Sequence, residues 1–189
     1  MPQDRFVVAI TGASGHAYGI RTLQVLRELG YETHLVMSRP AIVALAYESD
    51  MKLKDIQALA DHVHDNADIA APISSGSFRT RGMIVAPCSA KTLAEIATGM
   101  GATLVSRAAD VVLKERRRLV LLFRETPLHL VHCRNMVTAT EMGAIVMPPV
   151  PAFYPKPKTV EEIVDHTIGR ALDLFDIDSG KVKRWKEPS

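Results

Sequence analysis

The amino-acid sequence predicts an α/β fold in which helices cover both faces of a doubly wound parallel sheet. Five short apolar segments alternate with segments whose apolar residues recur at helical spacing. A turn rich in small residues, Thr11 to Gly15, follows the first apolar segment. The 189 residues suit a single domain, with a core over about 5–177 and a polar tail over 178–189.

Composition excludes several classes of protein. Apolar residues make up 47% of the chain and charged residues 23%, which is an ordinary globular balance. A formal net charge of +2 is too small to indicate nucleic-acid binding, and no apolar run approaches the ~20 residues that span a bilayer. The amino-terminal residues do not read as a signal peptide. We therefore expect a cytoplasmic protein with no nucleic-acid or membrane partner.

The first part of the chain predicts two strands, over 6–10 and 33–37, each followed by a helix. The first helix ends at Gly30, and Ser38 is placed to cap a second helix over about 40–48. Residues 50–72 predict only a short helix over about 54–60. His62 and His64 are predicted to be surface histidines, because no carboxylate pattern beside them completes a metal site.

The second part predicts three more strands, over 83–86, 119–123 and 144–147, with Pro87 ending the first of them. One helix, containing Leu93 and Ile96, is expected after the cap residue Ser89. Further helices are expected over about 104–114, 127–143 and 159–175, the last opened by a capping box at Thr159. The proline-rich connector 148–157 carries Phe153 and Tyr154, and the tail is expected to dock only in an oligomer. This alternation is flavodoxin-like or Rossmann-like.

Small and polar residues cluster where the predicted strands end. The Thr11 to Gly15 turn, the Ser89 to Thr92 turn and the Arg124-Glu125 pair should meet at one edge of the sheet, together with the small-residue loop 73–78. The pattern alone leaves ordinary alternatives open, namely plain strand-to-helix turns and a solvated strand exit. Cys88 is predicted to be a packed thiol. The Arg116 to Arg118 cluster is predicted to be solvated surface.

The order of these motifs resembles the UbiX family of flavin prenyltransferases, formerly described as aromatic-acid or phenolic-acid decarboxylases. The similarity covers about Phe6 to Ile177 and is carried by TGASG (11–15) with Tyr18-Gly19, SSGSF (74–78), APCSAKTL (86–93), RAADVVLKERR (107–117), RETPL (124–128), NM (135–136) and PPVPAFY (148–154). The resemblance implies a metal-independent enzyme that joins the dimethylallyl group of dimethylallyl phosphate to N5 and C6 of reduced FMN. Its product would be the prenylated FMN cofactor of UbiD-type decarboxylases.

The resemblance also implies roles for particular residues. Catalytic roles fall on Ser14, Glu48 and Glu125, and Glu125 suits proton transfer. FMN contacts fall on Gly12, Ala13, Ser14, Ser38, Ser89, Ala90, Lys91, Thr92 and Arg124. Prenyl-phosphate contacts fall on Arg107, Lys114, Tyr154 and Arg170, some of them from a neighbouring subunit. A homo-oligomer, commonly a dodecamer in the family, is implied, with sites at subunit interfaces.

Two alternatives remain beside this interpretation. One is an FMN-dependent cysteine-type decarboxylase of similar fold, although its Pro-x-Met-Asn motif is missing here. The other is a non-catalytic FMN-binding partner subunit of a decarboxylase, which would not need the charged residues above. His16 departs from the family pattern, where a small residue follows TGASG, and either tunes the flavin site or simply starts a helix.

Overall fold

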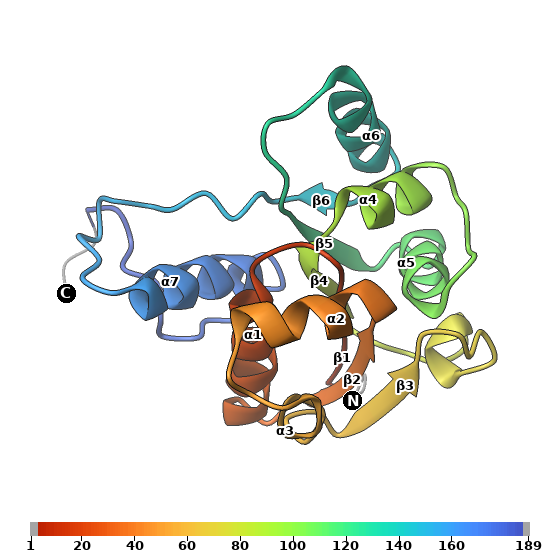
Figure 1. Ribbon diagram of the computed structural model, residues 1–189, viewed down its shortest axis with the longest axis horizontal. Coiled ribbons are helices and arrows are strands. Elements are labelled where there is room, and N and C mark those ends of the chain that lie inside the picture. Colours follow the sequence, from red (N-terminus) through yellow and green to blue (C-terminus); the bar gives the residue numbers. More distant parts are fainter. Residues whose placement is uncertain (1–3, 187–189) are drawn as a thin grey trace.

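A computed structural model describes residues 4–186, which form one parallel sheet of six strands in the order β3-β2-β1-β4-β5-β6 (Figure 1). The strands are β1 (Arg5–Ile10), β2 (Glu32–Met37), β3 (His62–Asp65), β4 (Gly82–Cys88), β5 (Arg118–Phe123) and β6 (Ile145–Val146). The helices are α1 (His16–Glu28), α2 (Arg39–Glu48), α3 (Leu53–Gln57), α4 (Ala90–Ala97), α5 (Leu104–Lys114), α6 (Leu130–Glu141) and α7 (Val160–Asp173), with a short 3₁₀ helix at Pro72–Ser74.

The sheet is doubly wound, as the sequence predicts. From β1 the chain moves outward through β2 to β3, and from β4 it moves outward in the opposite direction. Because side chains alternate along a strand, β1 contributes Phe6 and Val8 to a core with α1 and α7, and Val7 and Ala9 to a core with α4 and α5. The direction reverses between β1 and β4, the place where open α/β sheets bind ligands.

The prediction of five strands is wrong, because residues 62–65 form an additional edge strand, β3. It lacks the apolar run of a buried strand, since most of its side chains are exposed. His62 is exposed, but His64 is half-buried and stacks with the buried ring of His34 on β2. Burial lowers the pKa of both His34 and His64. The prediction of surface histidines is confirmed for His62 but wrong for His64. The expectation that no carboxylate lies beside them is wrong for His62, because the pairing of β3 with β2 brings the Glu32 carboxylate to it.

The end predicted for the third strand is wrong as well, because β4 continues through Pro87 to Cys88. Proline has no N–H to donate, and the pairing of β4 with β5 is irregular between Val85 and Cys88. The Pro87 carbonyl still accepts hydrogen bonds from the backbone N–H and the hydroxyl of Thr11. These bonds tie the end of β1 to the end of β4, so the strand persists beyond the proline.

The polar tail docks on its own chain, contrary to the expectation that it would dock only in an oligomer. Arg184 donates two hydrogen bonds to Asp173 on α7, at 2.9 and 3.0 Å. Val182 packs closely against Gly169 of the same helix. Residues 187–189 of the predicted tail lie outside the described residues. None of the helices within residues 4–186 is long and apolar enough to cross a membrane.

Candidate active site at the carboxyl edge of the sheet

A cavity of about 540 Å³ opens at the carboxyl ends of β1, β2, β4 and β5, beside the point where the winding direction reverses. Its volume falls within the range of small-molecule and cofactor sites. Most of the residues predicted for FMN binding or catalysis line it, namely Gly12, Ala13, Ser14, Ser38, Ser89, Ala90, Lys91, Thr92, Arg124 and Glu125. The parallel topology thus brings together loops that lie more than 100 residues apart in the chain.

Hydrogen bonds between the strand ends hold the loops of the cavity in place. The Ser89 N–H donates to Oγ1 of Thr11 at 2.9 Å, and that hydroxyl donates to the Pro87 carbonyl at 2.8 Å. The Arg124 N–H donates to the Cys88 carbonyl at 3.0 Å. The exits of β1, β4 and β5 therefore form one connected backbone platform, and ligand groups placed on it would meet rigid donors and acceptors.

Two helices begin at the cavity, and each has the serine cap predicted from the sequence. The Ser38 hydroxyl accepts the Ala41 N–H of α2, and the Ser89 hydroxyl accepts the Thr92 N–H of α4. The other N–H groups of a first helical turn have no partner within the helix and carry a partial positive charge. Both helix starts therefore suit a polar or anionic group such as the phosphate of a nucleotide-like cofactor.

Glu48 does not line this cavity but supports the glycine turn from behind. Its Oε2 accepts the N–H groups of Gly15 and His16 at 2.8 and 3.1 Å, and it lies 3.0 Å from Nδ1 of His16. Burial alone would raise the pKa of Glu48, but hydrogen bonds from the His16 ring, the two backbone N–H groups and the Ser14 hydroxyl hold it at about 2. Glu48 is therefore a carboxylate at neutral pH that positions Ser14.

His16 is buried at the start of α1, with Nε2 2.9 Å from the Ala41 carbonyl and Nδ1 facing Glu48. It links α1 to both ends of α2. The histidine that departs from the family pattern therefore connects the glycine turn to α2 through Glu48 and the Ala41 carbonyl. Sequence spacing could not reveal this link, because Glu48 lies 32 residues further along the chain.

Arg124 and Glu125 occupy the loop directly after β5. Arg124 is exposed, and its charge acts on the half-buried Tyr18, whose pKa is raised by burial and lowered in part by Arg124. Glu125 is half-buried at the cavity, where its Oε1 accepts the Thr126 N–H at 2.9 Å. Cys88 lies beneath this loop, and burial raises the pKa of its thiol far above the ordinary value. It is the inert packed thiol that the sequence predicts.

One copy of the chain does not bring the predicted prenyl-phosphate residues together. Within the described residues each is engaged elsewhere: Arg107 with Asp110, Lys114 with Glu115, Tyr154 with His166 and Arg170 with Asp173. Lys114 ends α5, whose first residues adjoin the cavity, so about 16 Å of helix separates the two ends. Arg170 lies on α7 and shares Asp173 with Arg184, and Tyr154 lies beside this helix in contact with His166 and Trp185.

The loop 73–78 was expected at the same edge, and this expectation is wrong. The loop precedes β4, so it lies at the amino edge of the sheet beside the end of α5. Arg117 donates to the carbonyl oxygens of Gly76 and Phe78 at 2.7 and 2.8 Å, and only 15% of its side chain is exposed. The description of Arg116 to Arg118 as solvated surface is therefore wrong for Arg117, which holds this loop.

Several residues that line the cavity were not predicted, notably Asn66, which follows β3. The Asn66 carbonyl accepts the Leu104 N–H and its Oδ1 accepts the Val105 N–H, so it fixes the start of α5. Arg39, Glu95 and Thr103 also line the cavity. Recognising β3 as a strand would have indicated Asn66, because polar residues at a strand exit collect at this edge.

Serine hydroxyls, free helical N–H groups and two arginines around a cavity at the switch point define a nucleotide-cofactor site of the flavodoxin type. The family model described as "Flavoprotein" matches residues 1–178, in agreement with this class. The chain is 53% identical over 181 residues to the flavin prenyltransferase UbiX of Thauera aromatica, covering 96% of this chain and 93% of that protein. It is 56% identical over 174 residues to the Escherichia coli UbiX, covering 92% of each.

Solved structures give the same relationship. A UbiX protein in complex with FMN and dimethylallyl pyrophosphate superposes with a TM-score of 0.96 at 55% identity, covering 99% of this chain and 100% of the other. A dodecameric FMN-dependent UbiX-like decarboxylase from Escherichia coli superposes with a TM-score of 0.94 at 50% identity, covering 97% and 100%. An FMN-dependent cysteine decarboxylase shares the fold alone, with a TM-score of 0.63 at 16% identity. This chain is an enzyme of the UbiX family of flavin prenyltransferases.

Proposed function

We propose that this protein joins the dimethylallyl group of dimethylallyl phosphate to N5 and C6 of reduced FMN, and that the prenylated FMN serves a UbiD-type decarboxylase. The observation that carries the proposal is the convergence of Ser14, Ser89, Arg124 and Glu125 on one cavity at the switch point. The UbiX structure with bound FMN and dimethylallyl pyrophosphate, at 55% identity, supports FMN and a phosphorylated dimethylallyl donor as the ligands here.

The residues of the cavity fit FMN in their chemistry. The free N–H groups that begin α2 and α4, together with the charge of Arg124, suit its phosphate and polar ring edge. Ser14, oriented by Glu48, offers a hydroxyl at the glycine turn. When bound, reduced FMN supplies an electron-rich ring that accepts the allyl carbon. The residues of the chain orient this ring and exclude water from it.

Glu125 is proposed to move the proton of the reaction. Closing the second bond adds flavin C6 to the tertiary carbon of the prenyl double bond, so the neighbouring prenyl carbon gains a proton and C6 loses one. A carboxylate at the cavity edge can accept the C6 proton and return it to the released phosphate, which has given a proton to the prenyl carbon. Glu48, whose pKa is about 2, is too weakly basic for this transfer at neutral pH and serves instead to hold Ser14. The two carboxylates that the resemblance groups together thus take different roles.

The prenyl phosphate is proposed to bind between copies of the chain. Departure of phosphate builds negative charge on oxygen, which Arg107, Lys114 and Arg170 can stabilise with charge-assisted hydrogen bonds, while Tyr154 adds a hydroxyl. Within one copy these residues fall into two groups, namely Arg107 and Lys114 along α5, and Arg170 on α7 with Tyr154 beside that helix. We propose that each phosphate site lies at a contact between two copies of the chain, and that the neighbouring copy supplies one of these two groups.

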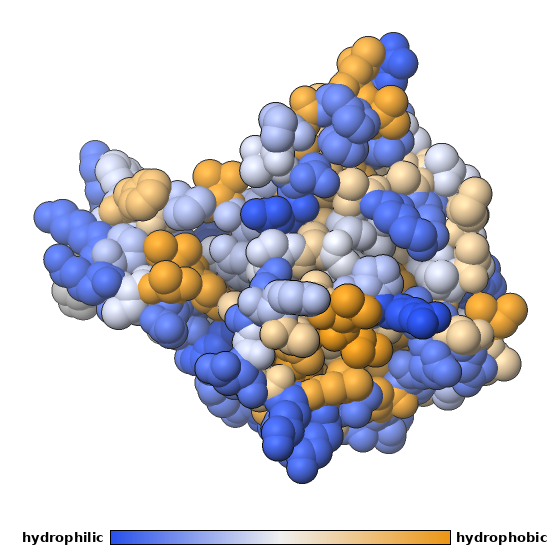
Figure 2. All heavy atoms as spheres, viewed as in Figure 1, coloured by the Kyte–Doolittle hydropathy of each residue, from blue (hydrophilic) through white to orange (hydrophobic). Residues whose placement is uncertain are grey.

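Exposed apolar side chains support self-association. α6 projects from the body of the molecule (Figure 1), and Figure 2 shows apolar side chains near its outer end and over α2. The large exposed ones are Leu130, Val131 and Val137 near or on α6, and Ile42, Val43 and Tyr47 on α2. Contiguous exposed apolar surface commonly marks an interface, and the Escherichia coli UbiX-like structure is a dodecamer.

The test is an anaerobic incubation of the full chain with reduced FMN and dimethylallyl phosphate, followed by mass spectrometry of the extracted flavin. We expect a flavin heavier by one dimethylallyl unit, formed only when both substrates are present. Enzyme that binds FMN but yields unmodified flavin with both the monophosphate and the diphosphate donor would overturn the proposal. Transfer of the product to a UbiD-type apoenzyme, read as restored decarboxylation, tests the final step separately.

A further inference from the structure

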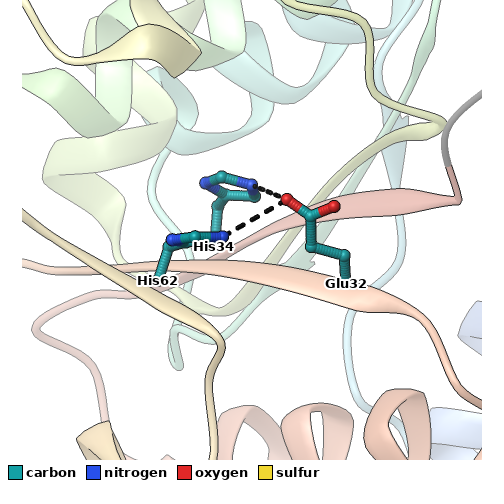
Figure 3. Close-up of side chains that lie close together, drawn as sticks. All are labelled: Glu32, His34 and His62. Atoms are coloured by element: carbon teal, nitrogen blue, oxygen red, sulfur yellow. Dashed lines mark hydrogen bonds and ion pairs between the residues drawn. The ribbon is translucent and has the colours of Figure 1, made fainter.

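A cluster of histidine and glutamate side chains lies at the amino edge of the sheet, away from the cavity described above. Glu32 opens β2, and His34 follows it by two residues, so both side chains lie on one face of the strand. His62 on β3 is the direct parallel partner of His34, which places its ring beside that of His34. Strand pairing alone therefore brings two imidazoles and one carboxylate together (Figure 3).

The ligand atoms of this cluster converge. Oε1 of Glu32 lies 3.0 Å from Nε2 of His34 and 3.4 Å from Nε2 of His62, and all three atoms lie within 4.8 Å of one another. Two ligands at about 2.1 Å from a tetrahedral Zn²⁺ lie about 3.4 Å apart, so these separations suit a shared ion. Figure 3 shows one nitrogen of each ring facing the same carboxylate oxygen of Glu32.

The surroundings of the cluster hold the ligand atoms in orientation. Nδ1 of His34 lies 2.9 Å from Nε2 of His64. In the tautomer that carries its proton on Nδ1, His34 donates to His64, and the lone pair of Nε2 is then directed at the side of Glu32 where a metal would bind. Arg5 donates to Oε2 of Glu32 at 2.8 Å and leaves Oε1 facing the histidines. The buried ring of His34 packs edge-on against Phe78. Outer contacts of this kind are typical of built metal sites.

We propose that Glu32, His34 and His62 form a binding site for a divalent transition metal of the Zn²⁺ class. Two imidazoles and one carboxylate are a ligand set of zinc sites that keep a fourth position for water, and His62 is exposed enough to admit it. The ion would tie the edge strand β3 to β2. Because the cluster lies at the amino ends of these strands and the flavin cavity lies at the carboxyl ends, the proposal is independent of prenyl transfer.

The test uses metal-free full-length protein titrated with Zn²⁺ against a chromophoric chelator, and with Co²⁺ followed by its visible absorption. We expect one tight Zn²⁺ per chain and a Co²⁺ spectrum of low coordination number. His62→Ala, at an exposed position, and Glu32→Gln should each weaken Zn²⁺ binding by about 100-fold or more, since loss of outer contacts alone costs 10–100-fold. Zn²⁺ should also raise the Tm of the wild type but not of His62→Ala.

The matched control is His132→Ala, which removes a histidine from the stacked His129–His132 pair at α6. This variant should bind Zn²⁺ as the wild type does. The proposal is overturned if the wild type takes up no stoichiometric Zn²⁺, if His62→Ala binds it equally well, or if His132→Ala loses it. Folding of each metal-free variant is checked by its Tm, and prenyl transfer should proceed with and without chelator.

Discussion

At the scale of single residues, the two glutamates near the glycine turn and the β5 exit are expected to behave differently. Glu125 is half-buried at the cavity and has no cation paired with it in the described part of the chain. Glu48 is held as a carboxylate by donors from the glycine turn. Replacing each by glutamine removes a charge at similar size, so the two variants separate proton transfer from positioning.

Glu125→Gln should retain FMN binding and lose turnover by about 10²-fold or more, because an amide cannot accept the proton at C6. The measurement is single-turnover prenylation beside an FMN titration followed by fluorescence. Glu125→Asp keeps a carboxylate and should recover part of the rate. Unchanged turnover in Glu125→Gln would remove Glu125 from the mechanism.

Glu48→Gln should lower stability at neutral pH by about 1–2 kcal/mol, a value reduced for the solvent that reaches this carboxylate. Its folded pKa of about 2 lies below the ordinary 4.5, so its contribution is complete above about pH 4.5 and is lost as pH falls toward 2. Urea unfolding at fixed protein concentration should show that the difference in unfolding free energy between wild type and variant shrinks over that pH interval.

The control for this experiment is Glu141→Gln, at an exposed position near the end of α6. It should leave stability nearly unchanged at every pH. A difference in unfolding free energy between wild type and Glu48→Gln that stays constant from pH 7 down to pH 3 would contradict the lowered pKa of Glu48. A carboxyl group whose pKa is the same in the folded and unfolded states contributes no pH-dependent stability.

At the scale of elements, the packing of α1 against β4 depends on Gly19. A Cβ added there would lie 2.3 Å from the Ala86 carbonyl oxygen and 2.7 Å from Cγ1 of Ile10, both in the core of the sheet. The helix must therefore approach the strands without a side chain at this position. This approach sets the height of the glycine turn relative to the exit of β4, and hence the floor of the flavin cavity.

Gly19→Ala should destabilise the protein by about 1–3 kcal/mol through overpacking and should weaken FMN binding, since α1 must move outward. The measurements are thermal unfolding and an FMN titration. Gly101→Ala is the matched control, because the nearest atom to its added Cβ is 3.8 Å away. Equal effects of the two substitutions on Tm and FMN affinity would show that close packing at Gly19 is not the cause of the destabilisation.

At the scale of the whole molecule, the proposed active site is complete only between copies. Lys114→Ala and Arg170→Ala should each be inactive when assembled alone, because each removes one part of the phosphate site. When the two variants are unfolded together and reassembled, some sites should contain both intact residues from different copies. We expect mixed assemblies to recover up to about a quarter of wild-type activity, as random mixing predicts.

The comparison is with separately reassembled variants at the same total concentration. No recovery in the mixture, with assembly verified by light scattering, would mean that one copy of the chain supplies both Lys114 and Arg170 to each site. Loss of FMN binding in Lys114→Ala would show instead that Lys114 belongs to the flavin site.

Sequence alone determined those features that depend on a few neighbouring residues. Ser38 and Ser89 were predicted as helix caps because a cap acts within three residues, and both caps are present. The parallel doubly wound sheet followed from alternating apolar runs and helical periods. The order of several motifs along the chain predicted the family, which the relatives confirm.

Tertiary structure decided what depends on partners far apart in the chain. Strand β3 is too polar to be recognised by its own composition, and only its pairing with β2 places His62 beside Glu32. The same holds for Arg117, which binds a loop about 40 residues earlier, and for Glu48 behind the glycine turn. Local sequence patterns indicate whether a segment is a helix or a strand, from the spacing of its apolar residues, and where that segment ends. They carry no information about which side chains the order of the strands will bring together.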